Sequence, residues 1–144
     1  MTRAVILWLA MATSVNAATL EERTFPASVV RVIDGDSVVV QIENWPLPFN
    51  PVELRLEGID TPESRKQDAK CEKEQKLGLI AKFWLRERLP PGSPVTVIWT
   101  GEREKYGRLL SEVISKGENI NRSLVRLGFA VEYHGGTKLS WCTP

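Results

Sequence analysis

Five charged residues, spread over three short stretches of the chain, form a set suited to holding a divalent cation beside a phosphate group. Three are carboxylates, Asp36, Asp60 and Glu63, and two are guanidinium groups, Arg55 and Arg108. Carboxylate oxygens are good ligands for Ca²⁺ and Mg²⁺, and the planar fork of arginine matches phosphate oxygens in pairs. Hydrolysis of a phosphodiester would use all five, because the cation neutralises the phosphate and the arginines stabilise the charge that builds on its oxygens.

Each stretch also has an ordinary structural interpretation. The Asp-Gly-Asp sequence at 34–36 is typical of a tight turn, and residues 61–63 suit the first turn of a helix. Arg55 and Arg108 would then be solvated surface charges. The occurrence of all these groups in one small domain favours the catalytic interpretation, in which Glu63 accepts a proton from an attacking water.

The elements predicted from the sequence must bring these groups together. Runs rich in β-branched and apolar residues predict five strands, at 27–33, 37–42, 52–57, 95–100 and 109–114. The first two are joined at Asp34-Gly35, a strong signal for a hairpin. In the third run Val52, Leu54 and Leu56 alternate with polar residues, so they should point inward and Arg55 away from them.

Two helices are predicted as well, a long one over 67–89 and a short one over 120–127 that ends at Gly128. Apolar residues recur along the long helix at the spacing of one face, and we expect these four to be buried: Leu77, Ile80, Ala81 and Trp84. Five strands and two helices in this order predict an α+β fold dominated by a five-stranded barrel of the oligonucleotide-binding (OB) type.

The first residues have the pattern of a secretory signal peptide. Arg3 precedes an apolar run at 4–12, and residues 15–17 are compact where a signal peptidase cuts. This run is much shorter than the roughly 20 residues of a membrane span, so a membrane anchor or a buried N-terminal helix is the less favoured interpretation. We expect a signal peptide at 1–17 and one secreted or periplasmic domain at 18–144, without a membrane segment.

Net charge gives no indication of the partner. Residues 18–144 contain 18 basic and 18 acidic side chains, so attraction to phosphate would depend on where the charges lie. Cys71 and Cys142 are the two cysteines of the chain. An even number in an exported protein favours a disulfide between them, with two free thiols as the alternative.

The motifs around the charged residues resemble those of the staphylococcal nuclease (thermonuclease) family. The resemblance covers about residues 27–133 and is carried by four segments, at 33–37, 55–63, 105–108 and 121–130. It implies an OB barrel and Ca²⁺-dependent cleavage of DNA and RNA with little sequence preference. It also implies products that end in a 3′-phosphate.

For the metal, the resemblance implies three ligands. Asp36 and Asp60 would bind Ca²⁺ through their carboxylates, and Thr61 would bind it through its backbone carbonyl. Asp34 would lie near the metal without touching it. Another divalent cation could replace Ca²⁺, because oxygen ligands of this kind are shared by Ca²⁺, Mg²⁺ and Mn²⁺.

For catalysis, the resemblance implies that Arg55 and Arg108 hold the scissile phosphate and that Arg108 also stabilises the departing oxygen. Glu63 would act as the general base or position the attacking water. Lys105 and Tyr106 would lie along the terminal phosphate and sugar. The function expected is that of an exported, monomeric, metal-dependent endonuclease. The alternative is a non-catalytic OB module that binds single-stranded nucleic acid or a protein partner.

The sequence also departs from the family pattern in three places. The proline-rich loop at 45–51 is enlarged, and residues 64–74 differ from the family's flexible basic loop and contain Cys71. The tail at 134–144 is short, so we expect the family's long C-terminal helix to be absent. A bridge between Cys71 and Cys142 would tie this tail to the start of the long helix.

Overall fold

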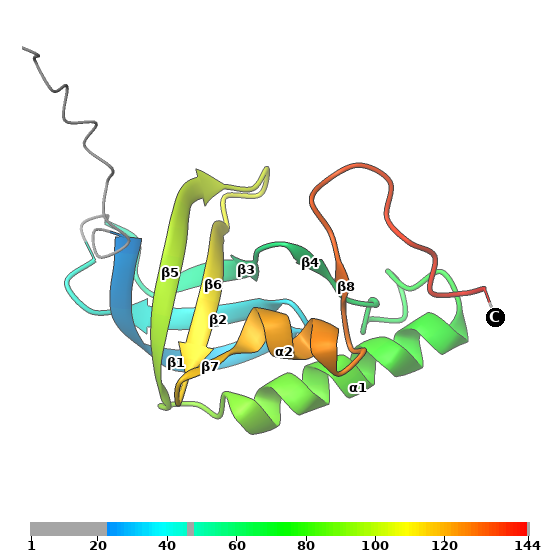
Figure 1. The fold of residues 1–144 in the computed structure, drawn as a ribbon, viewed down its shortest axis with the longest axis horizontal. Coiled ribbons are helices and arrows are strands. Elements are labelled where there is room, and N and C mark those ends of the chain that lie inside the picture. The colour runs from blue at the N-terminus through cyan, green and yellow to red at the C-terminus, as the bar shows by residue number, and fades with distance from the viewer. Residues whose placement is uncertain (1–22, 46–47, 144) are drawn as a thin grey trace, which may run out of the picture.

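The computed structural model of the chain describes residues 23–45 and 48–143. The signal peptide expected at 1–17 lies outside these residues. The main sheet has the order β3-β2-β1-β5-β6-β7, and parallel pairing of β3 with β6 closes its first five strands into a barrel (Figure 1). The strands are β1 (Thr24–Asp34), β2 (Ser37–Ile42), β3 (Val52–Leu56), β5 (Pro94–Arg103) and β6 (Leu109–Ser115). The predicted five-stranded OB-like barrel is therefore confirmed.

Three further strands of two residues each were not predicted from the sequence. β4 (Ile59–Asp60) pairs with β8 (Val131–Glu132) in a small separate sheet, and β7 (Glu118–Asn119) pairs with the end of β6. Such short segments carry no periodicity, so only their partners define them as strands. The β4–β8 pair brings the C-terminal part of the chain beside Asp60.

The core fills the barrel because inward positions along the strands alternate with outward ones. On β3 the side chains of Val52, Leu54 and Leu56 are buried, as predicted. Arg55 lies on the opposite face of the same strand. The barrel interior is thus apolar, while the outer surface next to the β1–β2 turn is free to hold charged groups.

The long helix, α1 (Glu72–Arg88), begins five residues later than predicted. Cys71 is its N-cap, and its Sγ accepts a hydrogen bond from the backbone N–H of Glu74 at 3.4 Å. Capping by a side chain at this position satisfies a free N–H of the first turn. The second helix, α2 (Ile120–Arg126), agrees with the prediction to within one residue.

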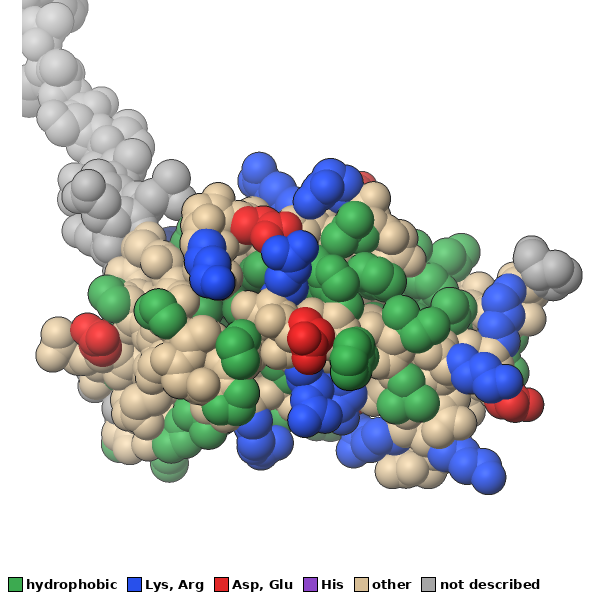
Figure 2. Space-filling view, turned by 90° about the horizontal axis from the view of Figure 1, so that it is seen from below, with side chains coloured by type: hydrophobic (Ala, Val, Ile, Leu, Met, Phe, Trp, Pro, Cys, Tyr) green, Lys and Arg blue, Asp and Glu red, His purple; other side chains and the backbone are tan. Residues whose placement is uncertain are grey.

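The buried face predicted for α1 was right in part. Ala81 is buried and Trp84 packs against the core, but Leu77 is only partly buried and Ile80 is 52% exposed. The buried residues of the helix are Glu74, Gly78, Ala81 and Leu85. The helix turns a glycine toward the segment at 61–64, and this rotates several larger apolar side chains outward. Figure 2, which views the molecule from below, shows hydrophobic side chains exposed among lysines and arginines on the lower face.

The segment that follows β4 is neither a helix start nor a regular turn. Residues 61–64 are irregular, and Thr61, Pro62 and Ser64 are buried. The alternative interpretation of Thr61-Pro62-Glu63 as the opening of a helix was therefore wrong. A buried irregular segment positions its backbone carbonyls and side chains individually, which is common near functional sites.

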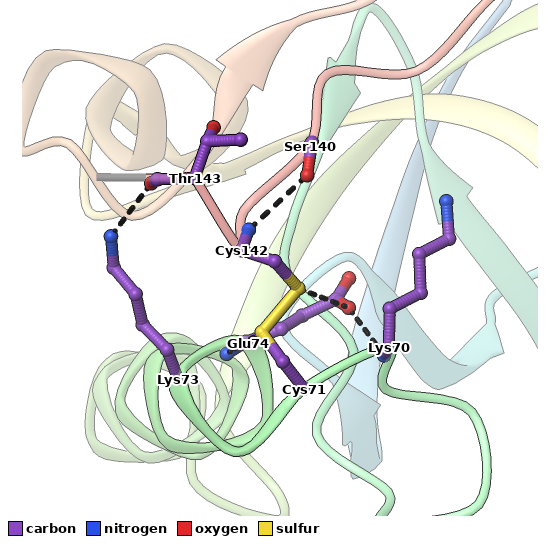
Figure 3. The surroundings of a disulfide bond; sticks show 7 residues. All are labelled: Lys70, Cys71, Lys73, Glu74, Ser140, Cys142 and Thr143. Atoms are coloured by element: carbon purple, nitrogen blue, oxygen red, sulfur yellow. Dashed lines mark hydrogen bonds between the residues drawn. A yellow bond between two sulfur atoms is a disulfide. The ribbon is translucent and has the colours of Figure 1, made fainter.

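The C-terminal tail contains no helix within residues 133–143, as expected. Cys71 and Cys142 form a disulfide, with their Cα atoms 6.0 Å apart, which confirms the favoured pairing (Figure 3). The Lys73 ammonium donates to the carbonyl of Thr143 at 2.9 Å beside it. Among the described residues, no helix has the length and apolar character needed to cross a membrane.

Candidate active site

The turn between β1 and β2 places Asp36 at the site. Asp34 pairs with Ser37, so the turn itself consists of Gly35 and Asp36, and Asp36 directly precedes β2. A Cβ atom at Gly35 would lie 3.0 Å from both Ala81 Cβ and Thr61 Oγ1. The missing side chain therefore lets the turn pack closely against α1 and Thr61.

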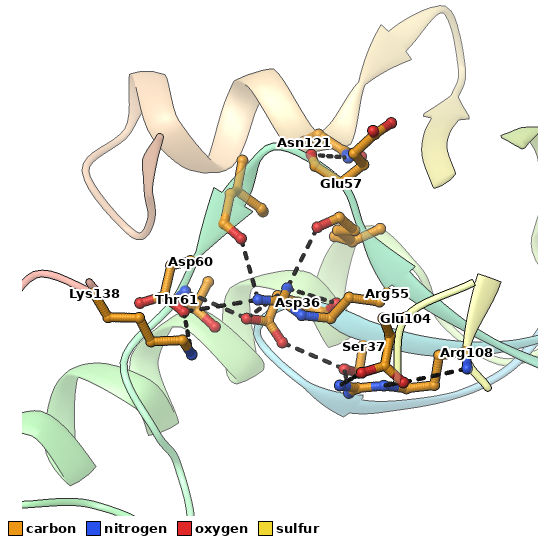
Figure 4. Close-up of polar contacts among 12 residues, drawn as sticks. Asp36, Ser37, Arg55, Glu57, Asp60, Thr61, Glu104, Arg108, Asn121 and Lys138 are labelled. Atoms are coloured by element: carbon orange, nitrogen blue, oxygen red, sulfur yellow. Dashed lines mark hydrogen bonds and ion pairs between the residues drawn. The ribbon is translucent and has the colours of Figure 1, made fainter. Parts of the chain in front are cut away.

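Arg55 joins two of the predicted metal ligands. Its Nη1 lies 2.8 Å from Asp36 Oδ2 and its Nη2 lies 3.7 Å from Asp60 Oδ1 (Figure 4). Nη2 also donates to the carbonyl of Ile59 at 3.2 Å. The Asp36 carboxylate in turn accepts a hydrogen bond from the backbone N–H of Thr61 at 3.3 Å. The turn, β3 and the end of β4 thus converge on one guanidinium group.

Asp60 is a nearly buried carboxylate, with 2% of its surface exposed. Its Oδ1 lies 2.7 Å from the ammonium of Lys138, a residue of the C-terminal tail. Arg55 forms a longer ion pair with the same oxygen, which accepts no hydrogen bond from any other group of the described residues. Burial lowers the pKa of Lys138, but its hydrogen bond and charge interaction with Asp60 outweigh this and raise the pKa overall.

Glu63 is half-buried and lines the same cleft as Asp36 and Arg55. Burial raises its pKa, the charges of Asp36 and Asp34 raise it further, and the charge of Lys138 opposes them. Asp34, which was placed near the metal without touching it, accepts a hydrogen bond from the Ser64 hydroxyl. Its carboxylate therefore helps to fix the irregular segment that carries Glu63.

Arg108 is held by a carboxylate that sequence reasoning missed. Its Nε and Nη2 each lie 3.2 Å from a different oxygen of Glu104, a bidentate pairing across the β5–β6 turn. Its Nη1 donates to the Ser37 hydroxyl at 3.0 Å, and that hydroxyl donates to Asp36 Oδ1 at 3.3 Å. A chain of hydrogen bonds thus connects Arg108 to the group around Arg55.

Lys105 and Tyr106 lie in the exposed β5–β6 turn. Tyr106 is 74% exposed, and its ring lies 4.9 Å from Lys105 Nζ and 5.9 Å from the guanidinium carbon of Arg108. An exposed aromatic ring flanked by cations can contact both a sugar and a phosphate. The two residues are therefore available at the rim of the site.

An open cleft of about 1460 Å³ connects these groups. The predicted site residues that line it are Asp34, Asp36, Arg55, Glu63, Lys105, Tyr106 and Arg108. Lys138 lines it as well, while Asp60 and Thr61 are buried beneath its surface. An open cleft of this size, with cationic groups along it, can accept an extended polymer that continues beyond the site at both ends.

The donors at this position fit a hard cation, since carboxylate and carbonyl oxygens are the preferred ligands of Ca²⁺ and Mg²⁺. The buried Oδ1 of Asp60 faces two cationic side chains, so positive charge is already drawn to this oxygen. Within the described part of the chain, no group of three or more His, Cys, Asp or Glu side chains could hold a metal. The set implied by the resemblance contains only two carboxylates and a carbonyl.

Comparison with protein families identifies the chain. The family model described as "Staphylococcal nuclease homologue" matches residues 53–139, which is more than half of the 144 residues. The chain belongs to this family. The matched range includes Arg55, Asp60, Glu63 and Arg108, while Asp36 lies on the N-terminal side of it.

Two relatives extend the comparison. A protein of Methanocaldococcus jannaschii, itself described as uncharacterized, is 30% identical over 129 residues, covering 73% of this chain and 58% of its own length. The thermonuclease of Staphylococcus hyicus is 29% identical over 117 residues, covering 81% of this chain and 63% of its own length. The chain thus spans about three fifths of each relative, and the resemblance found in the sequence is confirmed at the level of the nuclease family.

Asn121 is a further residue whose role the sequence did not reveal. It is buried, and its side chain accepts a hydrogen bond from Val113 N at 3.1 Å and donates one to the carbonyl of Ser111. It also donates to the carbonyl of Glu57 (Figure 4). These bonds hold α2 against the β3–β4 connection. A buried, fully bonded amide looks like any polar helix residue in a sequence, since its partners are distant along the chain.

Proposed function

We propose that this protein is a metal-dependent endonuclease that hydrolyses phosphodiester bonds of DNA and RNA with little sequence preference. The observation that carries the proposal is the sharing of Arg55 by Asp36 and Asp60, at 2.8 and 3.7 Å, beside a cleft that Glu63 and Arg108 line. The family match and the similarity to a thermonuclease support the same reaction. The products would end in a 3′-phosphate.

In this proposal a divalent cation, Ca²⁺, would be held by the carboxylates of Asp36 and Asp60 and by the carbonyl of Thr61. The cation would supply positive charge that neutralises the phosphate. Asp34 would stay outside the ligand set, since its carboxylate is engaged by the Ser64 hydroxyl. All three ligands come from the β1–β2 turn and the end of β4, which pack directly on each other.

Glu63 is the proposed general base. A carboxylate whose pKa is raised by burial accepts a proton from water more readily than an ordinary one. The same shift results from the nearby charges of Asp36 and Asp34. Its position in the irregular segment next to Asp60 and Thr61 keeps this base beside the proposed cation ligands.

Arg55 and Arg108 are the proposed phosphate-binding groups, because their forks can each donate two hydrogen bonds to phosphate oxygens. Arg108 would also stabilise the departing oxygen. Lys105 and Tyr106, at the rim of the cleft, would contact the terminal phosphate and the sugar. Stabilisation of developing charge by prepositioned donors is often the largest contribution to catalysis.

We also propose that residues 1–17 are removed on export and that residues 18–144 act as a monomer outside the cytoplasm. The Cys71–Cys142 disulfide supports an oxidising compartment, because such bonds seldom persist in the cytosol. N-terminal sequencing of the exported protein checks this, and a chain that still begins at Met1 would contradict it.

The decisive experiment is a plasmid and RNA cleavage assay with Ca²⁺, Mg²⁺ and Mn²⁺ in turn, each repeated with a chelator. We expect cleavage with Ca²⁺ that the chelator abolishes. Glu63→Gln should reduce turnover by roughly 10²- to 10⁴-fold, the usual contribution of a general base. Glu102→Gln, an exposed carboxylate of the same cleft without a proposed role, is the matched control and should remain active.

Binding of single strands without cleavage in any divalent metal would instead identify a non-catalytic OB module. Full activity of Glu63→Gln would remove Glu63 from the reaction while leaving the nuclease assignment intact. The wild-type protein distinguishes the two results. It does not cleave nucleic acid if the protein is a binding module, and it does cleave if only the role of Glu63 is wrong.

A further inference from the structure

Lys138 stands out among the charged residues near the cleft because the motifs do not account for it. Its ammonium lies 2.7 Å from Oδ1 of Asp60, one of the proposed cation ligands, and its side chain is 45% exposed (Figure 4). Asp60, by contrast, is almost fully buried. A half-exposed ammonium therefore contacts a buried carboxylate.

The tail that carries Lys138 is anchored on both sides of this residue. On one side, Tyr133 N donates to the carbonyl of Gly58 at 2.9 Å. On the other side, Cys142 is bonded to Cys71, at the start of α1 (Figure 3). Tethering at two points keeps the ammonium at a high effective concentration near Asp60, so it returns to the carboxylate quickly whenever it leaves.

We propose that Lys138 is a resident cation of the metal site, so that a divalent cation must displace its ammonium from Asp60 in order to bind. This inference rests on the proposed function, because it takes Asp60 to be a metal ligand. The Lys138 ammonium lies 2.7 Å from Oδ1, the distance at which a cation ligated by that oxygen would sit, whereas Arg55 lies farther away at 3.7 Å. A divalent cation and the ammonium would repel each other strongly there, since the Coulomb energy grows as their separation falls. Lys138 would thus set the affinity of the site for metal, as a positioning residue that acts through Asp60.

The distribution of charge and exposure favours displacement over a permanent ion pair. Arg55 also lies beside Asp60, at 3.7 Å, so this carboxylate retains a positive neighbour when Lys138 leaves. The Lys138 ammonium is half-exposed, so water can solvate it once it leaves, while the incoming cation takes its place beside the buried carboxylate. Lys138 also lines the open cleft, so its side chain has space into which it can move.

The test measures Ca²⁺ binding by isothermal titration calorimetry, without nucleic acid. Lys138→Met keeps the apolar stem and removes the charge, and it should lower the Ca²⁺ dissociation constant by roughly 3- to 10-fold, the range expected when a weak competing ion pair is removed. Lys138→Arg keeps the charge and should bind Ca²⁺ about as weakly as the wild type. Lys116→Met, at an exposed turn outside the cleft, removes the same charge and should leave the affinity unchanged.

A second arm tests the tether. Cys71→Ser together with Cys142→Ser removes the disulfide while keeping a capping side chain at the start of α1. Ca²⁺ affinity should rise in this variant. Lys138→Met should then raise the affinity by a smaller factor than it does in the wild type, because both changes weaken the same competitor. If the double serine variant fails to fold, titration of the wild type with and without a reductant gives the same comparison.

The outcomes separate this inference from the proposed function. Wild-type binding with an equal or weaker affinity in Lys138→Met would overturn the inference and leave the metal site standing. Absence of Ca²⁺ binding in the wild type and in Lys138→Met would overturn both. Tighter binding in Lys138→Met, with Lys116→Met unchanged, would establish the competition.

Discussion

At the scale of single residues, both arginines that were predicted to bind phosphate are paired with carboxylates. Arg55 contacts Asp36 and Asp60, and Arg108 is paired by Glu104. When a phosphate binds, the arginine therefore exchanges one anionic partner for another. The net binding free energy is smaller than the attraction between arginine and phosphate alone, because the existing carboxylate contacts are lost. Such pairing also keeps the guanidinium groups oriented toward the cleft.

The pairing of Glu104 with Arg108 predicts a pH dependence of stability. Burial raises the pKa of Glu104, but hydrogen bonds and charge from Arg108 outweigh this and lower the pKa in the folded protein. A folded pKa below the unfolded one gives stability that is fully present above the unfolded value and lost as the pH falls through the folded value. Glu104→Gln should therefore destabilise the protein most above about pH 5, with the difference fading below about pH 4.

Urea unfolding of the wild type and of Glu104→Gln across this pH range measures the effect. The control is Glu87→Gln, an exposed carboxylate of α1 whose neutralisation should give no such trend. A stability difference that grows as the pH falls would show that Glu104 is not stabilised in its charged form.

At the scale of elements, the site depends on the close approach of α1 to the segment that carries Glu63. Gly78 faces that segment, and a Cβ there would overlap the backbone of Glu63 and lie 2.6 Å from the carbonyl oxygen of Pro62. Glycine in the middle of a helix normally costs stability. Here it permits a contact that fixes the proposed base relative to Asp60.

Gly78→Ala should therefore reduce activity although alanine is the better helix former by about 1 kcal/mol. The overlap is with backbone atoms, which cannot rotate away, so either the helix or the Glu63 segment must move. We expect a loss of turnover of at least 10-fold, because misplacement by about 1 Å can cost 10²-fold. Circular dichroism and cleavage kinetics together measure this.

Glu87→Ala, at an exposed position of the same helix, is the matched control and should change neither the circular dichroism nor the cleavage kinetics appreciably. Unchanged kinetics in Gly78→Ala would mean that the approach of α1 does not position Glu63.

At the scale of the whole molecule, two closures hold the site together. The β3–β6 pairing closes the barrel and brings Arg55 beside the strand that follows Arg108. The disulfide joins residues separated by 71 positions in the sequence and closes a loop that includes all of α1, β5 and β6. A closed loop of this length restricts the unfolded chain strongly, which stabilises the folded state.

Reduction of the disulfide should lower the free energy of unfolding by up to about 4 kcal/mol in the chain-entropy description. The barrel core does not depend on the bond, so the reduced protein should remain folded with a lower melting temperature. Thermal unfolding with and without reductant measures the shift. An unchanged melting temperature would show that the disulfide does not stabilise the folded protein by restricting the unfolded chain.

The sequence by itself determined the barrel and pointed to the charged groups that the fold brings together. Alternating apolar residues such as those of β3 have only one face that can be buried, so they predict strands and their inward sides. Turn and carboxylate motifs around Asp36 and Asp60 identified the groups that converge on Arg55. These signals are local, because each depends on residues close together in the chain.

Only the tertiary structure decided the rest. The buried face of α1 follows from the contact of Gly78 with a distant segment, which no helical periodicity encodes. Glu104 and Lys138 became part of the site through a turn and a tethered tail that place them beside Arg108 and Asp60. Their importance comes from distances across the fold, and a sequence pattern records spacing along the chain but not through space.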